Sequence, residues 1–349
     1  MAKSDNLVDF LKDIADAIRE KTEDSGLINA QNFADKIRNL STGSTGSGWT
    51  GHADVEGLKA IGWTDEDIAY YQEHGVNWNE EDDEYHKVSE DNKALYGVLT
   101  ASNISTYKNR IIYLPKIDTA GRTSFSSFLN GCVSLVAIPK IDTSSATAMN
   151  MMFSSCRALY SVPKLDTSKA TNLSMMFNSC ASITHVPAFE TSSVLNFSSM
   201  FNGCSALVDV PSFDMSSAIS VSSMFNGCKA LVSLPPMNFT KVSEYSSAFA
   251  GCSSLVSISS LDMSGIGNSS SFIANCSNLM FPNFINCRIG IDFSATSVLS
   301  KESLLCIINN EAATSAITLK LASYAYTRLA NDPDIVAALA NHPNISIAQ

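Results

Sequence analysis

The chain of 349 residues has little charge, and most of the charge that it has is negative. Only 16% of its residues are charged, and the formal net charge is -11. A phosphate backbone is bound by clustered Lys and Arg, and the sequence has no basic arm or stripe long enough for that task. We therefore expect no nucleic-acid partner.

Long apolar runs are also missing. No stretch approaches the roughly 18 apolar residues that suggest a membrane-spanning helix. The N-terminus, MAKSDNLVDFLKDIADAIREK, has acidic residues throughout and lacks the apolar core of a signal peptide. We expect no membrane insertion, and export by the general secretory route is not supported.

Familiar catalytic motifs are absent as well. The sequence contains no GxSxG, no HExxH, no P-loop and no dinucleotide-binding fingerprint, and its five His residues are scattered. These absences indicate a protein that is not an enzyme and that needs no cofactor.

Cysteine is present in an odd number, nine, and seven of these residues recur at a regular spacing of 24. An odd number and a fixed period do not suit a disulfide framework. No CxxC or nearby His pair accompanies them, so we expect no zinc or other metal site. The recurring residues are Cys132, Cys156, Cys180, Cys204, Cys228, Cys252 and Cys276.

Other positions share this period, which is the signature of a repeat architecture. A large apolar residue stands three before each Cys, apolar residues stand three, six and nine after it, and a Pro follows the sixth position in most repeats. A single repeat is too small to fold alone, so stacking is required. The pattern predicts a solenoid over residues 110–287, with a short strand in every repeat and a helical or 3₁₀ return segment that ends at Gly.

These seven cysteines occupy the same position in successive repeats, an arrangement that we call a file. The cysteine file has two interpretations. A small buried thiol fits the tight corner where the return segment meets the strand, which predicts an inert ladder in the core. A functional thiol is the alternative. Parallel Cβ vectors in neighbouring repeats argue against disulfides between them.

Two charged files flank the predicted strand. One is acidic and includes Asp142, Asp166 and Asp214, each followed by Thr or Met and then a small residue, so capping of the following turn is the expected role and a calcium ladder the alternative. The other consists of Lys116, Lys140 and Lys164. These lysines are expected to pair with neighbouring acids on a solvated face, or else to form a docking stripe for an anionic glycan.

The flanks differ in composition from the repeats. Residues 1–40 predict a helical hairpin for attachment, 41–48 a flexible linker, 49–109 a small acidic module with all three Trp residues, and 288–349 an α/β cap that covers the last sheet edge. In the acidic module the aromatic residues are expected in a core, with sugar stacking as the alternative. The run from Glu80 to Glu84 is expected to be a solvated turn rather than a metal site.

Phrases such as MFNGCSALV and FDMSSA resemble the BspA-like, or Treponema pallidum class, leucine-rich repeats over about half of the chain. This resemblance implies an α+β protein, a leucine-rich-repeat β-solenoid with a role in binding proteins or glycans and no catalysis. Residues 7–40 resemble an N-terminal module of tail and other virion proteins of gut-bacterial phages, and 48–88 a segment that precedes such repeats in phage and Bacteroidetes proteins.

These resemblances lead to two functional hypotheses. The first is a phage virion protein (tail fibre, baseplate or head decoration), assembled in the host cytoplasm. Its N-terminal module would bind other virion proteins, and its solenoid would bind a protein or glycan of the host surface. The alternative is a bacterial cell-surface adhesin. Self-association into a homo-oligomer is compatible with both.

Overall fold

The computed structural model describes residues 55–73, 90–267, 269–310, 312 and 316–349. The chain divides into two compact units, Met1–Gly48 and Trp49–Gln349. The predicted hairpin and linker lie outside the described residues, as do Trp49, Trp78 and the acidic run from Glu80 to Glu84.

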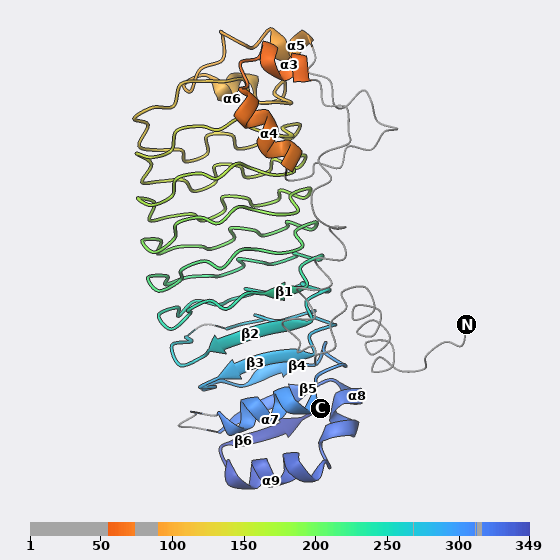
Figure 1. Cartoon of the computed structure of the whole chain (residues 1–349). Coiled ribbons are helices and arrows are strands. Elements are labelled where there is room, and N and C mark those ends of the chain that lie inside the picture. Colours follow the sequence, from red (N-terminus) through yellow and green to blue (C-terminus); the bar gives the residue numbers. More distant parts are fainter. Residues whose placement is uncertain (1–54, 74–89, 268, 311, 313–315) are drawn as a thin grey trace, which may run out of the picture. The chain divides into compact units, whose positions relative to one another are not determined.

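The described part of the second unit consists of a helical segment, a stack of 24-residue repeats and an α/β segment (Figure 1). The helices are α3 (Val55–Ala60), α4 (Asp65–Glu73), α5 (Glu90–Lys93), α6 (Ile104–Tyr107), α7 (Lys301–Asn309), α8 (Ser323–Leu329) and α9 (Pro333–Asn341). The strands are β1 (Ser233–Leu234), β2 (Ser257–Asp262), β3 (Phe281–Ile285), β4 (Ile291–Phe293), β5 (Ile317–Leu321) and β6 (Ile345–Ala348). None of the helices in these ranges is long and apolar enough to cross a membrane.

Backbone hydrogen bonds join each repeat to the next at fixed positions. The N–H groups of Phe201 and Gly203 donate to the C=O groups of Met224 and Asn226, at 2.8 and 2.7 Å. Residues between them, such as Asn202, instead donate to the carbonyl three residues back in their own repeat. The backbone therefore alternates between bonds within a repeat and bonds to the neighbour, which satisfies the polar groups of a segment that is not a helix.

The prediction of a helical return segment was wrong. Each repeat bends at two left-handed residues, five and one positions before the Cys, for example Ser199 at φ 57 and Gly203 at φ 76. A right-handed helix does not accommodate such angles. Gly suits the second position because it adopts a positive φ without steric cost, and Ser155, Ser179 and Asn275 take this position in other repeats.

The prediction of a strand in every repeat was also wrong. The repeats up to residue 232 hold isolated bridges, and a three-stranded parallel sheet, β1-β2-β3, forms only near the end of the stack. Proline explains the difference, because it has no N–H to donate to a ladder. Strand β1 ends at Leu234, directly before Pro235, whereas the longer β2 has Ser259 at that repeat position. Strand β3 contains Pro282 but lies at the edge of the sheet, where Pro is tolerated.

The core consists of files of identical or similar side chains. The rings of Phe153, Phe177, Phe201, Phe225 and Phe249 stack in sequence, with centroids 5.3 to 5.8 Å apart. Each is essentially inaccessible to solvent. Each of these repeats contributes one ring to this stack, and an inner ring is buried between those of its two neighbours. Stacking therefore provides the stability that a single repeat lacks.

The segment before the repeats shares a core with them. Trp63 and Tyr71 are buried together with Tyr113 and Ala137 of the first repeats. The indole N–H of Trp63 donates to the carbonyl of Leu114 at 2.9 Å. For Trp63, the expectation of a core role rather than an exposed sugar platform is confirmed.

The C-terminal segment contains the predicted elements. The hydroxyl of Ser300 accepts from the N–H of Ser303 at the start of α7, and Asp332 caps α9, whose first residue is Pro333. Helix α7 packs against β3, and β4, β5 and β6 form a second parallel sheet. The expectation of two capped helices and a strand is confirmed.

Candidate functional site

The cysteine ladder is a chain of thiol-to-carbonyl hydrogen bonds. Each thiol from the second repeat onward donates to the carbonyl of the large apolar residue in the preceding repeat, at 3.0 to 3.1 Å. Cys204, for example, donates to Phe177 at 3.0 Å. The same carbonyl accepts the N–H of Cys180, so each thiol supplies the second bond that a carbonyl can accept.

These thiols are not poised for chemistry. All seven are buried and unpaired. Burial raises the pKa of Cys132 and Cys276 to about 12 and raises the pKa of the five thiols between them as well. Nucleophilic and metal-binding cysteines need the thiolate, so this environment favours the inert interpretation.

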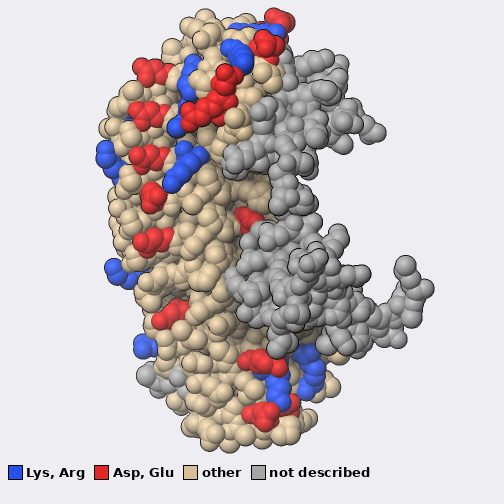
Figure 2. Space-filling model, viewed as in Figure 1, with Lys and Arg blue, Asp and Glu red and all other residues tan. Residues whose placement is uncertain are grey.

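The acidic file caps turns as expected. The carboxylates of Asp142, Asp166 and Asp214 each accept the N–H two residues later, at 2.9 to 3.0 Å. Hydrogen bonds from the following Ser residues lower the pKa of all three carboxyls. Figure 2 shows red side chains following one another along the repeats. Within the described ranges, no group of three His, Cys, Asp or Glu side chains is arranged to hold a metal ion.

The third feature is the proline wall, by which we mean the stacked extended segments 114–116, 138–140, 162–164, 186–188 and 210–212. Each has Pro in the middle, and the lysine file provides the last residue of the first three. These segments do not form a regular sheet. Their backbone N–H and C=O groups therefore need hydrogen-bond partners other than a neighbouring strand.

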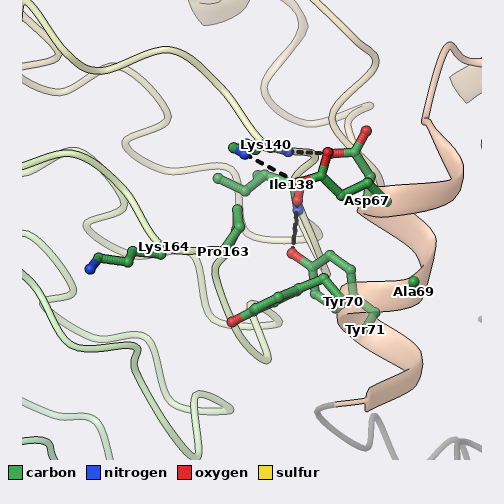
Figure 3. Close-up of a pocket in the computed structure, with 9 residues that line it drawn as sticks. Asp67, Ala69, Tyr70, Tyr71, Ile138, Lys140, Pro163 and Lys164 are labelled. Atoms are coloured by element: carbon green, nitrogen blue, oxygen red, sulfur yellow. Dashed lines mark hydrogen bonds and ion pairs between the residues drawn. The ribbon is translucent and has the colours of Figure 1, made fainter.

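Helix α4 supplies those partners to the first segments (Figure 3). The hydroxyl of Tyr71 donates to the carbonyl of Ile138 at 2.8 Å and accepts its N–H at 3.2 Å. Asp67 accepts the N–H of Lys140 at 2.7 Å, and Tyr70 donates to the carbonyl of Val162 at 2.7 Å. Side chains of one helix thus hydrogen-bond to two neighbouring repeats.

Asp67 is the central charged group of this contact. Its side chain is 1% exposed and lies 3.3 Å from the ammonium of Lys116. Burial opposes its ionisation, but hydrogen bonds from Thr64 and Lys140, together with the charge of Lys116, outweigh burial and lower its pKa. Burial raises the pKa of Tyr70 to about 12 and that of Tyr71 further.

All three residues of the lysine file form ion pairs with acids of the chain itself. Lys116 pairs with Asp67, Lys140 with Glu66 at 3.2 Å, and Lys164 with Glu190 at 3.5 Å. Two of the three partners come from α4 and not from the acidic file. The sequence analysis did not foresee this, although the spacing of Asp67 and Tyr71 by four residues on a helix was a signal.

Two hollows border this contact. A cavity of about 330 Å³ lies at α4, lined by Tyr70, Tyr71, Pro163 and Lys164 among others. In Figure 3 the side chain of Lys164 extends away from the helix. A groove of about 500 Å³ runs between the lysine file and the acidic file of the first repeats.

Beyond the cavity the proline wall is open. In segments 186–188 and 210–212, the N–H and C=O of the first residue and the N–H of the third have no hydrogen-bond partner in the described part of the chain. Ala188 and Ser212 are exposed. The side chain of His185 is 46% exposed, whereas Ala137 at the same repeat position under α4 is 3% exposed.

One file on this side has the composition of a catalytic triad. Ser161, His185 and Asp209 follow one another in successive repeats, and His185 Nδ1 lies 2.8 Å from Asp209 Oδ1. Among the described residues, the buried Ser161 hydroxyl makes no hydrogen bond to His185. Because activation of Ser requires a hydrogen bond to the His, this arrangement does not form a nucleophile.

Comparisons with known proteins concern the repeats. Residues 123–236 and 189–282 match the family described as "Mycoplasma protein of unknown function, DUF285". No curated protein matches the chain. None of these matches supports the expected likeness of the N-terminal segment to phage proteins.

Three solved structures are similar, each at 14% sequence identity. They are the leucine-rich repeat protein TpLRR of T. pallidum (59% of this chain and 87% of that chain, TM-score 0.29), internalin C2 of Listeria monocytogenes (70% and 83%, TM-score 0.26), and the functional domain of InlJ of Listeria monocytogenes, described as including a cysteine ladder (61% and 51%, TM-score 0.23). From the 24-residue ladders of its own structure and from the family match, we conclude that the chain has a leucine-rich-repeat-like fold and that its repeat region is similar to this mycoplasma family.

Proposed function

We propose that this protein is a non-catalytic binding protein of the bacterial cell surface, whose solenoid presents a flat wall to a macromolecular partner. One observation carries the proposal. The repeats direct their thiols and aromatic rings inward and leave on the outside a wall of backbone groups and small polar side chains. Such a surface suits contact over several repeats rather than chemistry at one point.

The bacterial surface is preferred to the virion. The virion hypothesis depended on the resemblance of residues 7–40 and 48–88 to phage proteins, and the family match lies outside both segments. That family is described as a mycoplasma protein, which favours a cellular protein. The inward-facing thiols suit either location, because burial keeps them from reacting.

Surface proteolysis tests the location. Intact cells that produce the protein are treated with trypsin, and the protein is followed by immunoblot against a cytoplasmic marker. We expect loss of the protein while the marker survives. Protection of the protein in intact cells, or its recovery only with purified phage particles, would contradict the proposal.

A binding assay tests the activity. The labelled full chain is incubated with host epithelial cells and with immobilised host extracellular proteins. We expect saturable binding that does not require divalent cations. A chain that binds none of these surfaces would refute the proposed function.

A further inference from the structure

The covered part of the proline wall serves as a template for what the open part binds. On segment 138–140 the Tyr71 hydroxyl bonds both the N–H and the C=O of the first residue, and the Asp67 carboxylate accepts the N–H of the third. On segment 162–164 the Tyr70 hydroxyl donates to the C=O of the first residue. None of these bonds depends on the identity of the side chain at the wall. Any repeat with the same backbone therefore offers the same set of donors and acceptors.

Segments 186–188 and 210–212 repeat that backbone without a partner in the residues that the structure describes. They have Pro at the centre, as the covered segments do, and apolar first residues that are buried, Val186 and Val210. The third residue differs, because Lys140 and Lys164 are succeeded by Ala188 and Ser212. Small side chains at these positions leave the backbone N–H accessible to an acceptor.

The open segments are continuous with the interface that already exists. The cavity of about 330 Å³ joins α4 to Pro163 and Lys164, next to the first open segment. Neighbouring repeats are one strand spacing apart, about 4.8 Å. Tyr70 and Tyr71 reach two neighbouring repeats at this spacing, whereas Asp67 and Tyr71, which are four residues apart on α4, bond the third and the first residue of one segment.

We propose that segments 186–188 and 210–212 are the docking site for a helix of a partner protein, and that this helix bears a carboxylate and a tyrosine four residues apart, as α4 does. The proposal rests on the proposed function and specifies its surface and partner chemistry. The carboxylate accepts the N–H of Ala188 or Ser212, and the tyrosine hydroxyls bridge the N–H and C=O of Val186 or Val210.

The probe for this site is a stable coiled coil that displays the side chains of Asp67, Tyr70 and Tyr71 on its outer face at their helical spacing. Its carrier guarantees helicity, which a short isolated peptide does not have. Binding of the labelled probe to the full chain is measured by fluorescence anisotropy. A second probe with Asp→Asn and Tyr→Phe at the three positions is expected to bind at least about tenfold more weakly, because the removed groups make the hydrogen bonds.

The matching change in the protein removes the donors of the wall. Ala188→Pro with Ser212→Pro deletes both N–H groups, and the fold already accommodates this change in the next repeat, where Pro236 follows Pro235. We expect affinity for the probe to fall at least about tenfold. The control is Ala188→Ser with Ser212→Ala, which keeps both N–H groups and is expected to bind like the unaltered chain.

Charge provides a second test that does not depend on proline. Ala188→Glu with Ser212→Glu brings like charge to the probe carboxylate and is expected to weaken binding, whereas Ala188→Lys with Ser212→Lys is expected to strengthen it. Equal binding by both probes, no binding of the first probe, or insensitivity to every change at 188 and 212 would overturn the proposal.

The two proposals fail in different ways. If the full chain binds host surfaces and the Ala188→Pro with Ser212→Pro variant binds them equally well, the docking site is wrong and the proposed function stands. If the full chain binds no host surface, the proposed function is wrong whatever the probe does.

Discussion

The covered and the open parts of the proline wall have the same repeat, and they differ in what lies on them. Under α4, Ala137 is buried, the N–H and C=O of Ile138 are paired with Tyr71, and Asp67 and Tyr70 pair with one backbone group each of the segments 138–140 and 162–164. Two repeats further on, the same groups are unpaired within the described residues. The comparison teaches that the core stacks without help from the wall, and that the wall is a separate surface with its own binding capacity.

The largest loss of stability is expected from a change in the core that supports both the covered and the open part of the proline wall. Phe201→Ala opens a cavity in the ring file between Phe177 and Phe225 and should lower the free energy of unfolding by about 3–5 kcal/mol. Chemical denaturation followed by circular dichroism measures it. Ile219→Ala is the control, because its side chain is 52% exposed and its loss should change stability by less than about 0.5 kcal/mol.

A smaller effect is expected where only the covered part is affected. Asp67→Ala removes the acceptor of the N–H of Lys140 and of the Thr64 hydroxyl, and should cost roughly 1.5–3 kcal/mol. Urea denaturation monitored by tryptophan fluorescence measures the change. Glu66→Gln is the matched control on the same helix, because its pair with Lys140 is exposed and contributes at most about 1 kcal/mol. Equal effects of the two changes would contradict the role given to Asp67.

The effect of Asp67 should depend on pH. Its pKa is lower in the folded protein than in the unfolded chain, so its contribution is present above the unfolded value of about 3.9 and is lost as pH falls through the folded value. The stability difference between the unaltered chain and Asp67→Ala should therefore be largest at neutral pH and shrink below about pH 4. Denaturation curves at pH 7 and pH 3 compare the two. A difference that grows in acid would contradict this sign.

The smallest effect is expected at the thiol ladder. Cys204→Ala removes one weak donor and a small volume, while the carbonyl of Phe177 keeps the N–H of Cys180, so we expect a cost of about 1 kcal/mol.

Alkylation of the native chain gives an independent measure of the ladder. Cys306 is partly exposed and should react first, whereas the seven ladder thiols should react only after denaturation. Mass spectrometry identifies the modified residues. Rapid modification of any ladder thiol in the native protein, or a disulfide between two of them, would contradict the inert interpretation.

Local sequence signals predicted some features well and others poorly. Ser300 and Pro333 were read correctly as helix starts, because capping is decided by residues within one helical turn. The Asp142 file was read correctly as turn caps for the same reason. The return segment was misread as helical, because Ser199 at φ 57 is a conformation that its sequence does not favour and that stacking imposes.

Two of the three ion-pair partners of the lysine file could not be predicted from the sequence. Lys116 and Lys140 were assigned to neighbouring acids, and their actual partners, Asp67 and Glu66, lie 49 and 74 residues away in the chain. Nothing in the periodicity of the repeats describes a helix that precedes them. The open segments of the wall were not recognised either, because an unpaired backbone group has no signature in the sequence.

The sequence by itself determined the period, the files of side chains in the core and the inert position of the thiols. These follow from identical residues at a fixed spacing, because identical side chains stack when each repeat makes the same hydrogen bonds to the next. Only the tertiary structure decided which repeats form strands, which lysines are paired and which part of the proline wall is left open. Those outcomes depend on contacts between segments far apart in the chain, and such contacts are selected by packing rather than by local residue preference.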